Sequence, residues 1–304
     1  MSWQPADEPI CPDASCDVIE VVITPRPSDL GAFEVKRALP SVKKRMIGPF
    51  IFFDQFGPTV LEAGRAMDVR PHPHIGLATI TWLIEGEILH RDSLGVVQTI
   101  RPGEVNWMTA GSGIVHSERS PESQRDIDCP LYGLQTWVAL PEDQAECQPD
   151  FSHYGAGDIP ALQGEGWAGS LIIGSLFGQK SPVKTASETV YADFKMTQGA
   201  IITLPGEIAE RGLYVLSGGI EIGGEAIGDG TLVALKGGPA VSFRATADSQ
   251  VFLIGGEPMD GPRNVYWNFV SSSKERIEKA KADWREGRFP KVPGDDDYIP
   301  LPAD

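Results

Sequence analysis

The sequence predicts an all-β protein with two domains in tandem and one short helix near the C-terminus. Its 304 residues exceed the usual size of one domain. It contains 34 glycines and 25 prolines, and its apolar runs are broken by turn residues at intervals of about 8–12 residues, which is typical of a β-sandwich or barrel. A weak internal repeat, described below, relates the two halves and favours duplication of one fold.

The first half consists of short segments that alternate in polarity or are rich in β-branched and aromatic residues, the pattern of strands. Residues 1–16 are expected to form a loose arm and residues 17–140 the first domain. Residues 141–169 lack periodicity and are expected to form the connection to the second domain. Strands are expected at residues 18–23, 33–39, 47–54, 77–85, 87–91, 96–100, 104–110 and 131–140.

The second domain is expected to span residues 170–304 and to end in a helix and an acidic tail. Ser272-Ser273-Lys274-Glu275 has the form of a capping box, which satisfies free amides at a helix start. Ile277, Ala280 and Trp284 then form an apolar stripe, so a helix is predicted near 273–286. Three aspartates at 295–297 are predicted to be a solvated run. The strands are expected at residues 170–176, 189–196, 200–204, 212–216, 220–222, 231–235, 240–243 and 250–254.

The internal repeat aligns two segments of each half. The pattern of residues 82–88 recurs at 214–220, and that of 103–108 recurs at 230–235. No histidine follows His153, so only the first copy can carry a histidine-rich metal site. The same offsets place the counterparts of the four candidate ligands described next near Leu204, Gly206, Phe243 and Ala245.

Three of the five histidines lie in two short motifs, His72-Pro73-His74 and His116-Ser117-Glu118. Side chains at i and i+2 of a strand share one face, and Pro73 excludes a helix. If the two strands face each other, His72, His74, His116 and Glu118 converge on one point. Three imidazoles and a carboxylate suit a first-row transition metal. Glu118 is also a candidate catalytic base for a phenolic hydroxyl.

Other polar and aromatic residues allow two interpretations. His90 is expected to be an ordinary packed or surface residue of its strand, with a supporting role behind a metal ligand as the alternative. The aromatic residues are expected to pack in the core, with a pocket lining as the alternative; they are Phe52, Phe53, Trp82 and Trp107.

Charge and cysteine content exclude several classes of function. The formal net charge is -16, and the basic run at 43–45 is too short to make a nucleic-acid patch. No apolar stretch approaches the ~20 residues of a membrane helix. The four cysteines are widely spaced and residues 1–8 do not resemble a secretory signal, so we expect a cytoplasmic protein with reduced thiols. We also expect it to be a monomer.

Several motifs together resemble the pirin family of the cupin superfamily. They are Gly48–Pro58, Arg70–Gly76, and Trp107–Glu118 with its sequence TAGSGIVHSE. The resemblance is strongest from Ala38 to Leu140. It implies two cupin barrels (jelly rolls) and an Fe(II) ion on His72, His74, His116 and Glu118, with Mn, Ni, Cu or Zn as alternatives for the same ligands.

The resemblance leaves two functions open. Some pirins are quercetinases, which open a flavonol ring with O₂ and would take a flavonol-like small molecule. Others are regulatory proteins that bind transcription factors or metabolic enzymes as protein partners. One departure is Ala78, where many pirins have glutamate. We expect metal binding to survive this change and the pocket to differ.

Overall fold

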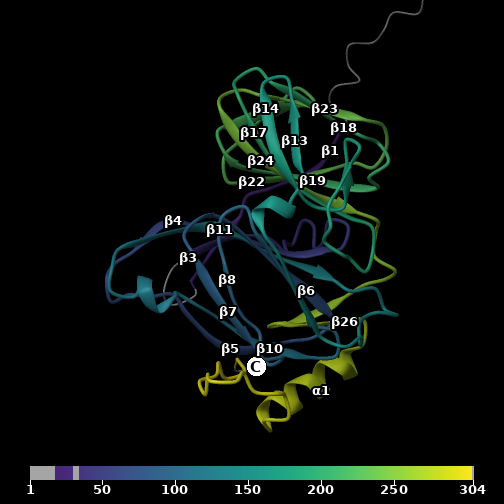
Figure 1. Cartoon of the computed structure of the whole chain (residues 1–304). Helices are drawn as coiled ribbons and strands as arrows, with labels where there is room; N and C mark the ends of the chain where they lie inside the picture. Colours follow the sequence, from purple (N-terminus) through teal and green to yellow (C-terminus); the bar gives the residue numbers. More distant parts are fainter. Residues whose placement is uncertain (1–17, 30–33, 303–304) are drawn as a thin grey trace, which may run out of the picture.

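The computed structural model describes residues 18–29 and 34–302. Two β-barrels are stacked end to end, with the second above the first in Figure 1 and the C-terminal helix beneath the first. Each barrel combines a seven-stranded sheet with a four-stranded sheet. The predicted class, two all-β jelly-roll domains in tandem with a short C-terminal helix, is confirmed.

The first barrel carries the histidine motifs on its smaller sheet. That sheet has the order β5 (Asp68–His74), β10 (Ile114–Arg119), β7 (Ile88–Asp92) and β8 (Val97–Ile100). The larger sheet has the order β12 (Asp150–Tyr154), β9 (Val105–Thr109), β6 (Leu77–Glu85), β11 (Cys129–Ala139), β4 (Phe50–Leu61), β3 (Glu34–Leu39) and β2 (Arg26–Asp29).

The second barrel repeats this arrangement. Its smaller sheet has the order β18 (Ile201–Leu204), β23 (Val241–Ala245), β20 (Gly219–Ile222) and β21 (Glu225–Gly228). Its larger sheet has the order β1 (Ile19–Ile23), β22 (Thr231–Leu235), β19 (Glu210–Ser217), β24 (Ser249–Gly256), β17 (Thr189–Met196), β14 (Trp167–Ile173) and β13 (Ala161–Gly164).

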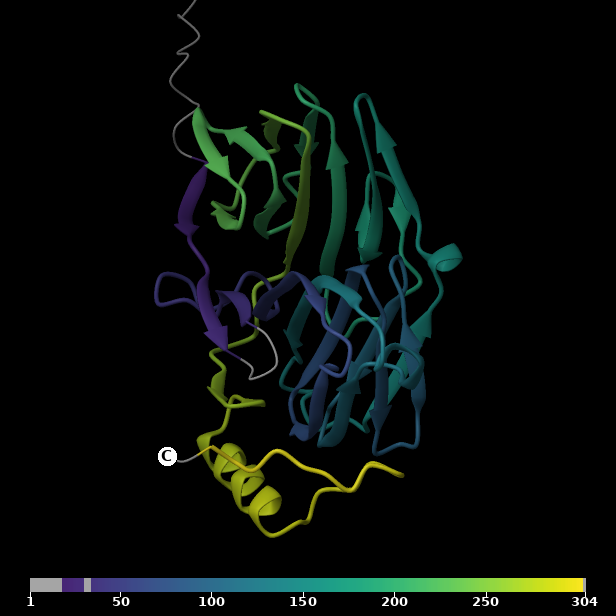
Figure 2. The same ribbon diagram turned by 90° about the vertical axis from the view of Figure 1, so that its left-hand side faces the viewer.

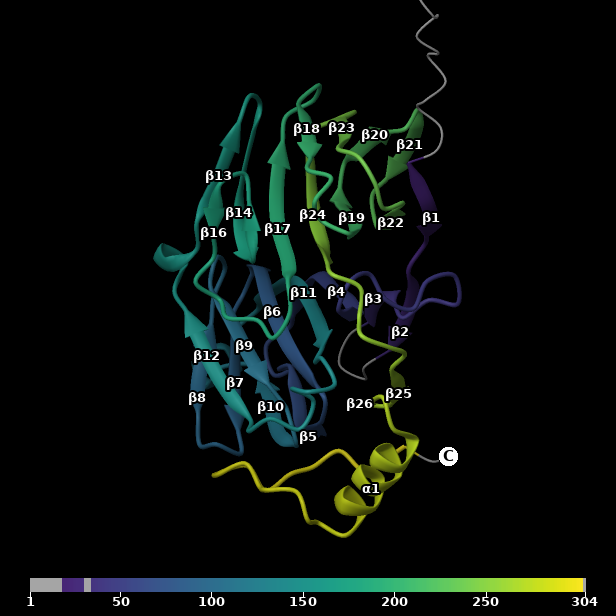
Figure 3. The ribbon, with the colours of Figure 1, turned by 90° about the vertical axis from the view of Figure 1, so that its right-hand side faces the viewer.

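Strand pairing crosses the boundaries expected from the sequence. β1, from the first segment of the chain, pairs with β22 of the second barrel, and β12, from the expected connection, pairs with β9 of the first (Figure 3). β13 also belongs to the second barrel. Each of these strands covers an edge of a large sheet, whose free N–H and C=O groups would otherwise be exposed.

The chain returns to the first barrel at its C-terminal end. A short hairpin of β25 (Asn264–Tyr266) and β26 (Phe269–Ser271) leads into α1 (Lys274–Arg285). Another short hairpin, β15 (Ser175–Leu176) with β16 (Gln179–Lys180), lies earlier in the chain, between β14 and β17. Ser273 caps α1 by accepting a hydrogen bond from the Arg276 amide, one residue after Ser272, which the capping box predicts as the cap. The helix itself lies where it was predicted. α1 and the tail lie below the first barrel, away from the second (Figure 2). Among the described residues, no helix has the length and hydropathy needed to span a membrane.

A shared aromatic core joins the two barrels. Phe53 of the first barrel packs on Tyr214 of the second with ring centroids 4.7 Å apart, and Phe50 meets Tyr191 at 5.7 Å. Trp82 and Trp107 belong to the same buried cluster, together with Phe53, so the expectation of core packing is confirmed for these three. The barrels therefore pack against each other through one shared apolar cluster.

Candidate metal centre

The structure brings three histidines of the first barrel together. β5 and β10 are antiparallel, with His72 directly opposite His116 and His74 opposite Ile114. All three imidazoles are buried, and one nitrogen atom from each lies within 4.8 Å of the others. The Nε2 atoms of His74 and His116 are 3.0 Å apart. The alternation of a strand, which predicted this convergence, accounts for it.

The donor set fits a metal ion. Burial lowers the pKa of all three histidines, that of His72 to about 4, so the rings are neutral as metal binding requires. The Nδ1 atom of His72 lies 2.9 Å from the Arg70 carbonyl and donates to it, which leaves the lone pair on Nε2. Two nitrogens that bind one ion at about 2.1 Å from perpendicular directions are ~3.0 Å apart.

Glu118 borders the same cavity but lies outside the close group of three donor atoms. It follows His116 by two residues on β10 and is half-buried. Burial raises the pKa of Glu118 to about 7, while side-chain hydrogen bonds with Thr81 and Gln135 act in the opposite direction. Its role as a fourth ligand or as a base stays a prediction.

Two of the three histidines, His72 and His74, line a cavity of about 310 Å³ inside the first barrel. One wall is aromatic, because Phe52 stacks on Trp137 with centroids 3.9 Å apart. A polar patch is made by Arg37, which donates two hydrogen bonds to Asp54 at 2.9 and 2.7 Å. The remaining lining is mostly apolar and includes Val35, Phe56, Met67, Val69, Ile88, Trp267 and Ile299. Phe52 therefore lines the pocket, contrary to the expectation of core packing alone.

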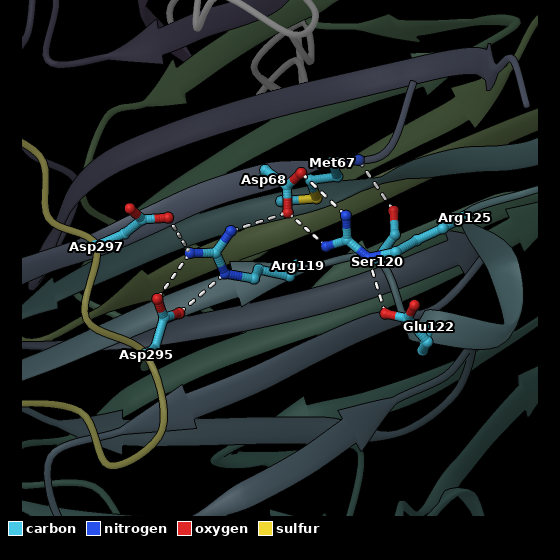
Figure 4. Close-up of polar contacts among 8 residues, drawn as sticks. All are labelled: Met67, Asp68, Arg119, Ser120, Glu122, Arg125, Asp295 and Asp297. Carbon is cyan, nitrogen blue, oxygen red and sulfur yellow. Dashed lines mark hydrogen bonds and ion pairs between the residues drawn. The ribbon is translucent and has the colours of Figure 1, made fainter. Parts of the chain in front are cut away.

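The C-terminal tail completes the cavity. Arg119 of β10 binds Asp295 through Nε and Nη2 at 2.9 and 2.8 Å, and also contacts Asp297 and Asp68 (Figure 4). The Ile299 amide donates to the Pro71 carbonyl at 2.8 Å. The prediction of a solvated acidic run is therefore wrong for Asp295, whose side chain is only 8% exposed.

Ala78 has no place in the cavity wall. It is fully buried on the face of β6 that packs into the core between the barrels. The alternation of β6 directs Thr79 and Thr81 to the opposite face. Ala78 therefore makes no direct contact with the cavity. The expected difference in the pocket does not follow from the side chain at this position.

Sequence reasoning did not single out Arg37, Asp54, Trp137, Trp267 or Ile299. These residues are scattered over β3, β4, β11, the loop before β26 and the tail. No local spacing marks them, because only the closure of the barrel and the return of the C-terminal segment bring them together. The long alternating run of β11 was the one available signal for Trp137.

Comparisons with known proteins find relatives that cover most of the chain. The family model described as pirin matches residues 32–138, and the model of the pirin C-terminal cupin domain matches residues 191–290. A pirin-like protein of Caulobacter vibrioides is 47% identical over 290 residues, which cover 94% of this chain and all of the relative.

Two solved structures are also similar. A quercetin 2,3-dioxygenase from Acinetobacter baumannii superposes with a TM-score of 0.87 and 35% identity, covering 94% of this chain and 96% of the other. A bacterial pirin from Escherichia coli, solved in complex with nickel(II), has a TM-score of 0.63 at 20% identity and covers 79% of this chain and 99% of the other. The latter likeness concerns the fold alone.

Proposed function

Because the chain belongs to the pirin family, we propose that it is a metal-dependent dioxygenase of the quercetin 2,3-dioxygenase type. The observation that carries this proposal is a buried cluster of three neutral imidazoles that opens onto an apolar, partly aromatic cavity. A pocket of this kind suits a flat organic substrate beside a metal ion.

The proposed ligands are His72, His74, His116 and Glu118. We propose Fe(II) as the metal, with nickel as the first alternative because a fold relative was solved with it. Mn, Cu and Zn suit the same donors. When bound, the ion supplies a Lewis acid and open coordination positions next to the cavity.

The residues of the chain have separate roles in this proposal. The Phe52–Trp137 stack presents an aromatic surface against which a flavonol ring can lie. The Arg37–Asp54 pair offers hydrogen-bonding groups to substrate hydroxyls. Glu118 accepts the proton of the substrate hydroxyl that lies nearest to the ligands. The apolar lining and the C-terminal tail keep bulk water away from the reacting carbon atoms.

The test is anaerobic reconstitution with Fe(II), followed by measurement of oxygen uptake on addition of quercetin. We expect the wild type to consume oxygen and Glu118→Ala to lose most of this activity. Metal content is measured in the same samples, so loss of the ion is separated from loss of the base. Parallel loading with nickel(II) ranks the two metals.

Absence of oxygen uptake by the fully iron-loaded wild type would overturn the proposal. The regulatory alternative, in which the metal-loaded protein binds a protein partner without turnover, would then be favoured. The comparison requires a flavonol in excess and a metal stoichiometry near one per chain, since a half-loaded sample decides neither case.

A further inference from the structure

A second buried pair lies behind the histidine cluster. His90 and Asp92 are on β7, in register with Glu118 and His116 of β10. Both are buried, with Asp92 fully inaccessible. The Nε2 atom of His90 is 3.0 Å from Asp92 Oδ2, and its Nδ1 atom is 3.3 Å from His116 Nδ1. Asp92, His90 and His116 thus form a continuous hydrogen-bonded row that ends at the cluster.

The direction of each hydrogen bond in this row follows from donor and acceptor chemistry. Asp92 Oδ1 accepts from the backbone amides of Leu94 and Val96, so the carboxylate acts as an acceptor throughout. A His90 ring that carries a single proton therefore holds it on Nε2, where it is donated to Asp92 Oδ2. This leaves a lone pair on His90 Nδ1, and the hydrogen bond to His116 has to be donated by His116 Nδ1.

The row thereby selects one tautomer of His116. With its proton on Nδ1, the free lone pair is on Nε2, the atom that lies 3.0 Å from His74 Nε2. That is the atom that belongs to the metal-ligating group. His90 itself faces the far side of the His116 ring, and its own ring is stacked on Phe151 with centroids 4.5 Å apart. It is therefore not a ligand in this geometry.

We propose that Asp92 and His90 are positioning residues of the metal centre, which hold His116 in the metal-binding tautomer and fix the angle of its ring. A ligating histidine commonly donates its second N–H to a partner that increases its basicity. Here the partner is a second histidine backed by a buried carboxylate. The inference rests on metal binding at the three histidines but does not require dioxygenase activity.

The second barrel supports a functional rather than a structural role for this pair. The positions opposite Ala245 and Phe243 on β20 hold Ile220 and Ile222, both buried. The same fold is therefore built with isoleucine at the positions that correspond to the pair. A buried polar row is costlier than an apolar one, so its presence beside the cluster is explained by what it does for His116.

The experiment uses the full-length protein and three variants. His90→Ile reproduces the side chain of the second barrel, His90→Asn retains an acceptor for His116 without the link to Asp92, and His153→Asn is a histidine control outside the site. Metal affinity is measured with Ni(II) and Zn(II) against a competing chelator. The position of the His116 proton is measured in metal-free protein by ¹⁵N NMR of labelled histidine.

We expect His90→Ile to weaken metal binding by about 10–100-fold, His90→Asn to lose less, and His153→Asn to behave as wild type. The wild-type His116 should carry its proton on Nδ1, and His90→Ile should shift it toward Nε2. Two results would overturn the proposal: an Nε2 proton on His116 in the wild type, or unchanged affinity in folded His90→Ile. A wild type that binds metal but lacks oxygen uptake would contradict only the proposed function.

Discussion

The two barrels share a strand order but have opposite interiors. The smaller sheet runs β5-β10-β7-β8 in the first barrel and β18-β23-β20-β21 in the second. In the first, His116 lies between His72 and Asp92 on the neighbouring strands. In the second, Phe243 lies between Ile202 and Ile222. The same strand register therefore places a row of polar residues in the first barrel where the second barrel has a row of apolar residues.

The difference extends around the barrel. In the first barrel, His72, His74, Glu118 and the Arg37–Asp54 pair line a cavity among apolar residues, whereas buried aliphatic and aromatic residues fill the second. The second barrel gains stability from this packing, because buried apolar area and close contact both favour the folded state. The first barrel gives up part of that gain to keep a cavity with histidines in its wall. The comparison teaches that the same strand order accommodates either a packed interior or a cavity with histidines in its wall.

The largest effect on metal binding is expected at His116. His116→Ala removes a ligand, so metal affinity should fall on the order of a hundredfold or more, since loss of a residue behind a ligand already costs about 10–100-fold. Elemental analysis after dialysis measures the bound metal, with wild type loaded in parallel. Stoichiometric metal in the variant would show that the ligand assignment is wrong.

In the second barrel, the residue that corresponds to His116 is Phe243, and its replacement should lower the free energy of unfolding rather than metal affinity. Phe243→Ala leaves a cavity in a packed core and should cost about 3–5 kcal/mol. His116→Ala in metal-free protein should cost far less, because the ring packs against His72 and His74, which already line a cavity. Urea unfolding of both metal-free variants makes the comparison. Equal losses would mean that the first barrel depends on its histidines for folding.

The second barrel contains a buried carboxylic acid, Asp193, whose effect on stability depends on pH. Asp193 on β17 is buried and accepts a hydrogen bond from Gln250 at 2.9 Å, yet burial raises its pKa to about 6. The folded state thus binds this proton more tightly than the unfolded state, and the charged form destabilises the protein above pH 6. The penalty is relieved as the pH falls toward 4.

Asp193→Asn should therefore raise the thermal midpoint at pH 8 and have little effect at pH 4. The gain at pH 8 is expected to be on the order of 2 kcal/mol. Asp143→Asn, at an exposed position, is the control at both pH values. A gain that is the same at pH 4 and pH 8 would assign the effect to packing rather than to charge.

Local patterns in the sequence predicted most of the long strands, α1 and the histidine cluster. The alternation of a strand places His72 and His74 on one face regardless of what surrounds them, and the serine pair before α1 marks its start to within one residue. The repeat offsets correctly gave Phe243 and Ala245 as counterparts of His116 and Glu118, because β10 and β23 have the same register with their neighbours.

The offsets were wrong by two residues for the other strand. The register places Ile202 opposite Phe243, where Leu204 was expected as the counterpart of His72. The two segments between β5 and β6 and between β18 and β19 differ in length, and a fixed offset cannot follow such a change. The pairing of β1 with the second barrel and of β12 with the first was also missed, since it depends on contacts between distant segments.

The position of the C-terminal tail was the other feature that local patterns did not predict. In the described part of the chain, residues 295–299 contact the first barrel and α1. Arg119 lies on the solvent side of β10, next to Glu118, and binds Asp295 from a segment 176 residues away. An acidic run is usually solvated. Here it is ordered because it meets an arginine on the barrel and because Ile299 fills the cavity wall.

The smallest effect is therefore expected for Arg119→Ala, which removes the ion pairs between the tail and β10. A partly exposed pair contributes about 1 kcal/mol, so the tail should open roughly fivefold more often. Hydrogen exchange of the Ile299 amide, which bonds to the Pro71 carbonyl, measures this opening. Arg101→Ala, which removes an exposed pair with Glu87, is the control and should leave that amide unchanged. If Arg119→Ala also left Ile299 exchange unchanged, the hydrogen bonds of Ile299 with Pro71 and Trp284, together with its apolar contacts, would hold the tail without the ion pairs. The closed wall of the first barrel would then not depend on Arg119.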